Sequence, residues 1–183
     1  MGLHEVDQLW QTASRIRYRC GSCSRIHEGL PDIVFDAPHY FYSVPEDERA
    51  ERCHLTSDLC VIDEQDFFVR CLLEIPITGM DERFGWGIWC SLSEKNFRGY
   101  QATYDEPTQS QIGPFFGWFS SRLPSYGDTL LLRCEVRPQD GGARPCVILE
   151  QSDHELAIEQ RNGMAIARAI GLAKRVGAKL VIG

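Results

Sequence analysis

The sequence predicts an α+β fold, with a mainly antiparallel sheet and covering helices. Segments with the period-2 alternation of strands outnumber segments with helical spacing, their connections are short, and no βαβ alternation is visible. The chain has 183 residues, of which 43% are hydrophobic and 25% charged, as in ordinary globular proteins. We therefore expect a single domain over residues 1–183, without internal repeats or a linker.

The first third of the chain shows few signals of regular structure. Apolar residues recur at helical spacing over residues 3–13 and then alternate with arginines over 16–20, which predicts a short helix followed by a short strand. The turn Cys20-Gly-Ser-Cys23 comes next. Three prolines and many acidic residues interrupt residues 28–66, so we expect the cysteine- and histidine-containing segment 18–62 to be largely irregular.

The clearest strands are predicted within residues 66–150. Residues 67–77 place Arg70 and Glu74 on one face and an apolar set on the other, and residues 84–92 repeat the alternation. The six residues between the two runs suit a hairpin. We predict that the apolar set is buried, since a slip by one residue would bury Arg70 instead. The residues predicted to be buried are Phe67, Val69, Cys71, Leu73 and Ile75, and Ile77 continues the alternation.

Aromatic residues are frequent in this region and allow two interpretations. They could line a ligand-binding cleft, but their period-2 order favours an aromatic core. Gly85 and Gly87 share a face with Trp89, and the missing Cβ atoms would let another backbone or a partner approach closely. The aromatic residues concerned are Trp86, Trp89 and Trp118, with Phe115, Phe116 and Phe119 from a further predicted strand.

Helix signals complete the assignment. Ser93 is a good N-cap for one inserted helix over 94–104, and two more strands are predicted at 130–136 and 145–150. C-terminal helices are expected over 152–176, beginning with the capping-box pattern Ser152-Asp-His-Glu155. Asn162-Gly163 resembles the end of the first of them, and a last helix follows over 164–176. His154 is interpreted as a neighbour of the cap and not as a general base.

The formal net charge of −7, from 26 acidic and 19 basic residues, restricts the possible partners. It opposes nucleic-acid binding, which needs clustered Lys and Arg, but it is compatible with a basic protein partner. The acidic run Pro45-Glu-Asp-Glu-Arg49 is continued by four further acids. It is either a solvated loop or the surface that binds such a partner. The four further acids are Asp58, Asp63, Glu64 and Asp66.

The cellular setting is predicted from two missing signals. The sequence shows no export signal and no apolar run of about 18 residues. We therefore expect a cytoplasmic protein with no membrane partner. In that reducing compartment its eight cysteines should form no structural disulfide. The oligomeric state is not predicted.

The most specific local pattern is Cys20-x-x-Cys23-x-x-x-His27. Two residues between the cysteines allow a turn that aims both sulfur atoms at one ion, and thiolate with imidazole is a set that zinc prefers. One helical turn would place Cys23 and His27 on the same side. We therefore predict structural zinc at an N-terminal zinc-knuckle-like turn. Cys60 is favoured as the fourth ligand, because it directly precedes the first long strand, over Cys53, His54 and His39.

The functional hypothesis follows from this site and from missing motifs. A thioredoxin-like redox function of Cys20 and Cys23 would need a βαβ context. The sequence also lacks a phosphate-binding loop, a nucleophile elbow and a His-Glu-x-x-His helix. We favour a zinc-binding, non-enzymatic domain that acts through protein contacts, for example as an immunity-type protein that neutralises a toxin. The alternative is a metal- or cysteine-dependent enzyme with an aromatic-lined pocket.

The same segments resemble a bacterial family known as domain of unknown function 2199, over about residues 18–170. Cys71 and Ser24 depart from the family pattern, which has glycine there, but neither is a predicted ligand. The resemblance implies no activity, and it groups Cys20, Cys23, His27 and Cys60 as one constellation. The resemblance rests on Cys20-Gly-Ser-Cys23-Ser-Arg-Ile-His27, Leu55-Thr-Ser-Asp-Leu-Cys-Val-Ile-Asp63, Phe68-Val-Arg70, Leu73-Glu-Ile-Pro-Ile77, Trp86-Gly-Ile-Trp-Cys-Ser-Leu-Ser-Glu-Lys-Asn-Phe97, Phe116-Gly-Trp118, Leu123-Pro124 and Asp153-His-Glu-Leu-Ala157.

Overall fold

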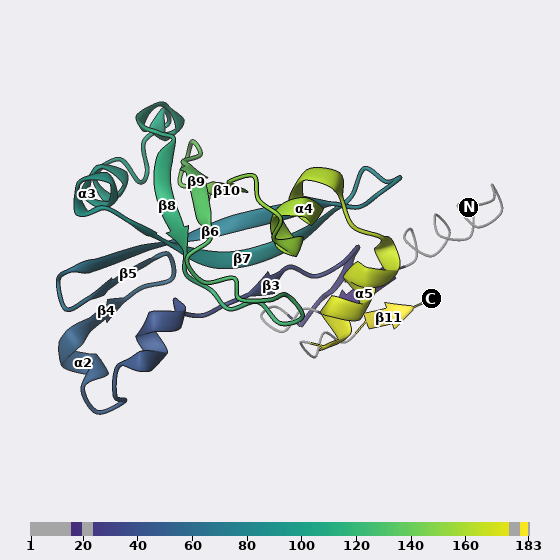
Figure 1. The fold of residues 1–183 in the computed structure, drawn as a ribbon, viewed down its shortest axis with the longest axis horizontal. Coiled ribbons are helices and arrows are strands. Elements are labelled where there is room, and N and C mark those ends of the chain that lie inside the picture. Colours follow the sequence, from purple (N-terminus) through teal and green to yellow (C-terminus); the bar gives the residue numbers. More distant parts are fainter. Residues whose placement is uncertain (1–15, 20–23, 176–179, 183) are drawn as a thin grey trace.

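The computed structural model describes residues 16–19, 24–175 and 180–182 (Figure 1). Its helices are η1 (His39–Ser43), α2 (Arg49–Arg52), α3 (Glu94–Ala102), η2 (Gln109–Ile112), α4 (Glu155–Asn162) and α5 (Ile166–Arg175). Its strands are β1 (Ile16–Arg19), β2 (Ile26–Glu28), β3 (Ile33–Val34), β4 (Cys53–Leu55), β5 (Leu59–Ile62), β6 (Asp66–Pro76), β7 (Arg83–Leu92), β8 (Phe115–Phe119), β9 (Arg133–Arg137), β10 (Cys146–Leu149) and β11 (Leu180–Ile182). The α+β class is therefore confirmed. In this described part, no helix is long and apolar enough to span a membrane.

The hairpin of β6 and β7 is the centre of the fold. Its register runs from Phe67 opposite Leu92 to Pro76 opposite Arg83. The predicted apolar face of β6 is fully buried, whereas Arg70 on the opposite face is half-buried, so the predicted register is confirmed. Long alternating runs of this kind fix both the strand and the face that it buries.

The sheet closes on itself, which the sequence did not predict. From β7 the strands β8, β9 and β10 follow in antiparallel order, and β10 returns to β6 through a parallel pairing of Cys146 with Leu72. Five strands thus enclose the main core. Alternation along a strand reveals its buried face but not its neighbours, so neither this closure nor the parallel pairing of β3 with β7 could be anticipated.

Covering helices were predicted, and the structure places them at the two ends of the β6–β7 ladder (Figure 1). At one end α3 is capped by Ser93, whose Oγ accepts from Asn96 N at 3.4 Å, and its Phe97 ring lies 5.2 Å from that of Phe67. At the other end, α4 and α5 lie near the C-terminal end of β6. There Met164 N, in the connection between the two helices, donates to the Pro76 carbonyl at 2.8 Å. The inserted helix ends at 102, two residues earlier than predicted.

Residues 28–66 are not irregular, and that prediction is wrong. They contain β3, η1, α2, β4 and β5, and the β4–β5 hairpin extends the sheet by pairing β5 with the first residues of β6. Each of these elements is two to five residues long. Such short elements span too little sequence to display a period, so periodicity analysis misses them.

The close approach predicted at Gly85 and Gly87 is made by the chain itself. Strand β3 runs parallel to β7, with Val34 opposite Gly87. A Cβ atom on Gly87 would lie 2.7 Å from Val34 Cγ1, and one on Gly85 would lie 2.0 Å from Asp32 Oδ1. The two glycines are therefore required for β3 to dock.

A second, three-stranded sheet joins the two ends of the described chain. Strand β1 confirms the short strand predicted at 16–20, and it pairs with β2 and β11. The segment 178–183, which the sequence did not place, thus supplies a strand. The predicted helix 3–13 and the zinc-knuckle-like turn 20–23 lie outside the described residues.

The predicted C-terminal boundaries need two corrections. The N-cap of α4 is His154, whose Nδ1 accepts from Leu156 N at 3.1 Å, and not Ser152 of the proposed capping box. Strand β9 begins at Arg133 and not at 130, since Leu131 has a φ of 60° that extended strands do not adopt. Helix α4 ends as predicted, with Gly163 at a φ of 85°.

Candidate functional site

The negative charge of the protein is concentrated in one segment. Residues 28–66, here called the acidic segment, contain eleven acidic and two basic residues, a net charge of −9. The whole chain carries −7, so the remainder is slightly positive. The sequence analysis named seven of these acids, all from 46 onward, and missed Glu28, Asp32, Asp36 and Glu51. A charge count over the segment, instead of a search for runs, would have found them.

A small core of its own attaches the acidic segment to the outer surface of the central hairpin. Cys60 and Ile62 from β5 pack with Val44, Phe68 and Trp89, all buried. The indole of Trp89 also donates through Nε1 to the Phe35 carbonyl at 2.9 Å. The acidic segment is therefore folded onto the sheet, although Glu46, Asp47 and Glu48 of the predicted run, with Asp63 and Glu64, lie in exposed turns.

Both basic residues of the acidic segment are already engaged within it. Arg52 donates to Glu48 and to Asp63 at 2.6 Å each, and Arg49 donates through Nε to the Val44 carbonyl at 3.0 Å. Hydrogen bonds from Arg52 lower the pKa of Asp63. The acids that make no ion pair within the described residues include Glu46, Asp47, Glu51, Glu64 and Asp66. Their charge is available to a partner.

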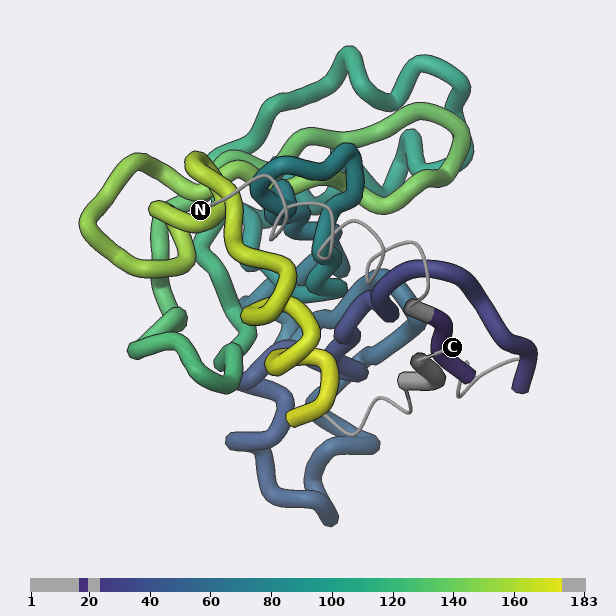
Figure 2. The backbone as a smooth tube through the Cα atoms, turned by 90° about the vertical axis from the view of Figure 1, so that its right-hand side faces the viewer, coloured from purple at the N-terminus to yellow at the C-terminus, as the bar shows by residue number. Residues whose placement is uncertain are grey.

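Apolar side chains accompany these charges. Val34, Tyr42 and Leu55 belong to the acidic segment and are among the exposed large hydrophobic residues of the protein. In Figures 1 and 2, α2 and β4 lie below the β6–β7 hairpin, and β8 to β10 lie on its other side. Exposed apolar groups among charges of one sign are typical of a surface that recognises a charged protein.

Only half of the predicted zinc constellation lies in the described residues. Cys20 and Cys23 lie outside the described residues, so their geometry is not described. His27 is exposed on β2 and lies opposite Tyr18 of β1, with their rings stacked at 5.4 Å. His27 is therefore on a strand, which removes the helical-turn argument that placed it beside Cys23.

Cys60 has the surroundings of a core residue. Its side chain is 0% exposed, in the apolar core beneath the acidic segment, and it belongs to a different sheet from His27. Burial raises the pKa of its thiol to about 12. Zinc binds the thiolate, so such an environment works against coordination.

The other candidates for a fourth ligand are Cys53 and His54 on β4 and His39 on η1. His39 instead lies edge-on to Tyr40, with 5.9 Å between the ring centroids. Among the described residues, no three His, Cys, Asp or Glu side chains are arranged to hold a metal ion.

The aromatic residues divide between the core and the surface. Trp86, Trp89, Phe115 and Phe119 are buried, which confirms the core interpretation for them. Along β8, Phe116 and Trp118 alternate with the buried Phe115 and Phe119 and face solvent. They do not line a deep cleft.

Five of the six described cysteines have a raised thiol pKa, which is the opposite of what a nucleophile needs. Burial raises the pKa of Cys53, Cys60, Cys90 and Cys146. The pKa of Cys134 is raised by contact with Cys90, 3.6 Å away between sulfur atoms, and by burial. An activated cysteine would have a lowered pKa, so these groups do not favour the enzyme hypothesis.

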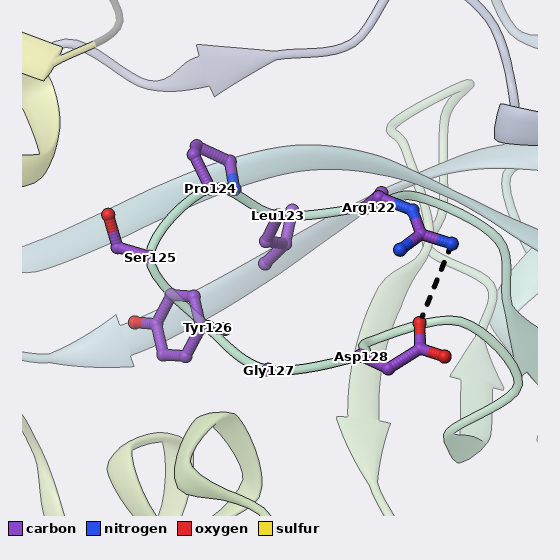
Figure 3. Close-up of a pocket in the computed structure, with 7 residues that line it drawn as sticks. All are labelled: Arg122, Leu123, Pro124, Ser125, Tyr126, Gly127 and Asp128. Atoms are coloured by element: carbon purple, nitrogen blue, oxygen red, sulfur yellow. Dashed lines mark ion pairs between the residues drawn. The ribbon is translucent and has the colours of Figure 1, made fainter.

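The loop 122–128 surrounds an open hollow of about 500 Å³ (Figure 3). Arg122 and Asp128 form an ion pair of 3.8 Å at one end of the loop, and Ser125 and Tyr126 lie at the other. Both hydroxyls are engaged. Tyr126 donates to Glu159 at 2.5 Å, and Ser125 accepts from an Arg175 guanidinium at 2.6 Å. These bonds anchor the loop to α4 and α5 and leave no hydroxyl poised as a nucleophile in the hollow.

Comparison with known proteins agrees with the resemblance seen in the sequence. A model of the family described as uncharacterized protein conserved in bacteria (DUF2199) matches residues 19–164. No curated protein and no solved structure matches the chain. The matched region includes the acidic segment, the closed sheet and α4. Because it covers most of the chain, the protein belongs to this family of proteins conserved in bacteria.

Proposed function

We propose that this protein is a non-enzymatic binding domain whose acidic segment docks a basic protein partner. The observation that carries the proposal is the segregation of charge, because residues 28–66 hold more than the entire net negative charge of the chain. Such a surface steers an oppositely charged protein into contact and fixes its orientation. A toxin with a basic functional surface is one partner of this kind, which would make the domain an immunity-type protein.

The fold supports a role for the acidic segment in binding. The core around Trp89 and Phe68 fixes the segment on the sheet, so its charges are presented with little loss of conformational freedom on association. Tyr42 and Leu55 supply the apolar contacts that charges alone do not provide. The raised thiol pKa values and the engaged hydroxyls of the loop 122–128 make the enzyme hypothesis the weaker one.

A zinc ion at the N-terminal turn is part of the same proposal. Cys20, Cys23 and His27 provide three ligands of the type zinc prefers, and the ion would hold the chain that leads into the acidic segment. The placement of Cys60 argues that the fourth position is filled by another group.

The test compares two variants with equal changes in charge. The first neutralises Glu46→Gln, Asp47→Asn, Glu51→Gln and Glu64→Gln. The matched control neutralises Asp81→Asn, Glu82→Gln, Asp105→Asn and Glu106→Gln, which are exposed and lie outside the segment. Proteins that co-purify from a bacterial lysate with each form are quantified, and direct affinities of the enriched ones are then measured with purified components at two salt concentrations.

The proposal expects a basic partner whose affinity falls at least about tenfold in the first variant, falls with added salt, and is nearly unchanged in the control. A partner that is not basic, or one whose binding weakens equally in both variants, would refute it.

A further inference from the structure

The outer face of β8, β9 and β10 has a regular arrangement of side chains. Pairing of the three strands places Trp118 beside Arg133, and Phe116 beside Glu135, which in turn neighbours Ile148. These residues alternate with the buried ones on the same strands. The face therefore consists of cross-strand rows with apolar residues on the outer strands β8 and β10 and charges on the middle one.

Large apolar side chains on this face are unusually accessible. Phe116 is 47% exposed and Leu131, two residues before β9, is 57% exposed; Trp118 and Ile148 are exposed as well. Leu131 also has a φ of 60°, a conformation that branched residues adopt rarely and at a cost in free energy. We call these four residues with their charged neighbours the aromatic face. Nothing in the described part of the chain covers it.

The charges of the aromatic face are balanced. Arg133 donates to Glu150 at 2.6 Å, and its guanidinium lies 5.0 Å from the Phe116 ring and 5.7 Å from the Trp118 ring. Arg137 pairs with Glu135. Two positive and two negative groups thus give a net charge of zero, on a protein whose acidic segment carries −9.

The aromatic face has hollows as well as projections. One hollow of about 290 Å³ lies beside Phe116, between Pro114, Glu135 and Ile148. A second hollow of about 220 Å³ lies beside Leu131, between Arg133 and Glu150. Projecting apolar groups next to hollows of comparable size can interlock with an identical surface.

From these features we propose that the aromatic face binds the same face of a second copy, giving a two-fold symmetric dimer. A two-fold interface must be self-complementary, and a face with equal numbers of both charges and with projections beside hollows meets that demand. A basic partner would instead be matched by a face of net negative charge. Two copies that each carry −7 repel one another, and contact through a neutral face keeps the charge-bearing segments apart.

This inference is independent of the proposed function. The acidic segment and the strands β8 to β10 lie on different sides of the β6–β7 hairpin in Figures 1 and 2. A dimer formed by the aromatic face would present two acidic segments to its partners. Failure of partner binding would not alter the mass of the protein, and a monomeric protein could still bind a basic partner.

The test is the mass of the full chain in solution by sedimentation equilibrium. At about 100 µM, a concentration at which even micromolar affinity gives mostly dimer, the expected mass is twice the 20.8 kDa of one chain. The variant Trp118→Ser should weaken association at least about tenfold, because aromatic anchors carry much of the energy of such interfaces. The matched control Tyr42→Ser removes an exposed aromatic residue of the acidic segment and should leave association unchanged.

Charge balance is tested by Glu150→Lys, which makes the face positive in both copies. Its association should be weaker than that of the parent at low salt and should recover partly at high salt. Circular dichroism checks that each variant is folded. A parent chain that stays at 20.8 kDa at about 100 µM, or a dimer weakened equally by Trp118→Ser and Tyr42→Ser, would overturn the proposal.

Discussion

Arg144 donates through Nε to Asp58 Oδ1 at 2.7 Å and thereby joins two loops that lie 86 residues apart in the chain. Asp58 lies in the turn between β4 and β5, and Arg144 in the connection between β9 and β10. The Asp58 side chain is only 16% exposed, and its other oxygen accepts from Ser57 Oγ at 2.6 Å. This pair fastens the acidic segment to the closed sheet.

The first prediction is that Asp58→Asn lowers the free energy of unfolding by about 1–2 kcal/mol, since a hydrogen bond to a charged group is lost in a partly screened site. Asp105→Asn, an exposed acid without an ion pair in the described residues, should change it by less than about 0.5 kcal/mol. Urea unfolding followed by tryptophan fluorescence measures both. Equal stability of the two variants would show that the Arg144 contact contributes nothing.

The second prediction concerns pH. Burial alone would raise the pKa of Asp58, but hydrogen bonds from Ser57 and Arg144 outweigh it, and the net pKa is lowered. A carboxylate with a lowered folded-state pKa contributes stability above its unfolded value of about 3.9, and that stability is lost as the pH falls through the folded value. We therefore expect the stability difference between the parent and Asp58→Asn to be constant above about pH 5 and to shrink below pH 4. A difference that persists at about pH 2 would assign the effect to packing instead.

The third prediction uses the glycines of β7. An alanine Cβ at Gly87 would meet Val34 Cγ1 at 2.7 Å, so Gly87→Ala should displace β3 and destabilise the protein by about 1–3 kcal/mol. Gly99 lies inside α3, and nothing is within 4 Å of its would-be Cβ. Gly99→Ala should therefore stabilise the protein by up to about 1 kcal/mol.

Thermal unfolding of the two glycine variants gives shifts of opposite sign if β3 is docked as described. Hydrogen exchange at the Phe35 amide, which donates to the Gly87 carbonyl at 2.9 Å, reports on the docking directly. Protection at Phe35 that is unchanged in Gly87→Ala would mean that the strand adapts without leaving β7.

The sequence predicted the parts of the fold that long periodic segments determine. The register of β6, the helix capped by Ser93 and the end of α4 at Gly163 were all correct, because each depends on local spacing or local backbone geometry. The closure through Cys146 and Leu72 depends on contacts between distant segments, which alternation does not encode. The two-residue strand β3 is too short to carry any pattern.

For the candidate surfaces too, local patterns could be predicted from the sequence, whereas contacts between distant segments could not. The acidic run at 46–48 and the acids at 58, 63, 64 and 66 were recognised as a possible binding surface, but the attachment of the segment by Trp89 and Cys60 could be seen only in the fold. Cys60 was predicted as a zinc ligand from its position before a strand, and the alternation of β5 buries it instead. The aromatic face could not be separated from the core by composition, because Phe116 and Trp118 alternate with the buried Phe115 and Phe119.

The last prediction separates the two interpretations of Cys60. If Cys20, Cys23 and His27 hold zinc, protein purified without added metal should contain nearly one zinc per chain, and Cys23→Ser should lose it, because structural zinc binds tightly at neutral pH. Cys60→Val removes the thiol but keeps an apolar side chain of similar size. It should retain the zinc, since Cys60 is buried among Val44, Ile62 and Phe68.

The zinc measurement is metal content by mass spectrometry on folded protein, with Cys146→Ser on β10 as a control for the loss of a thiol elsewhere. Less than about 0.2 zinc per chain in the parent would remove the site altogether. Zinc that is lost in Cys60→Val and kept in Cys146→Ser would instead make Cys60 the fourth ligand. The small core around Trp89 would then have to open to admit the ion, because the Cys60 thiol is fully buried in the described fold. Chelation would in that case let the core close over Trp89 and shift its fluorescence, whereas zinc held without Cys60 leaves the emission of that core unchanged.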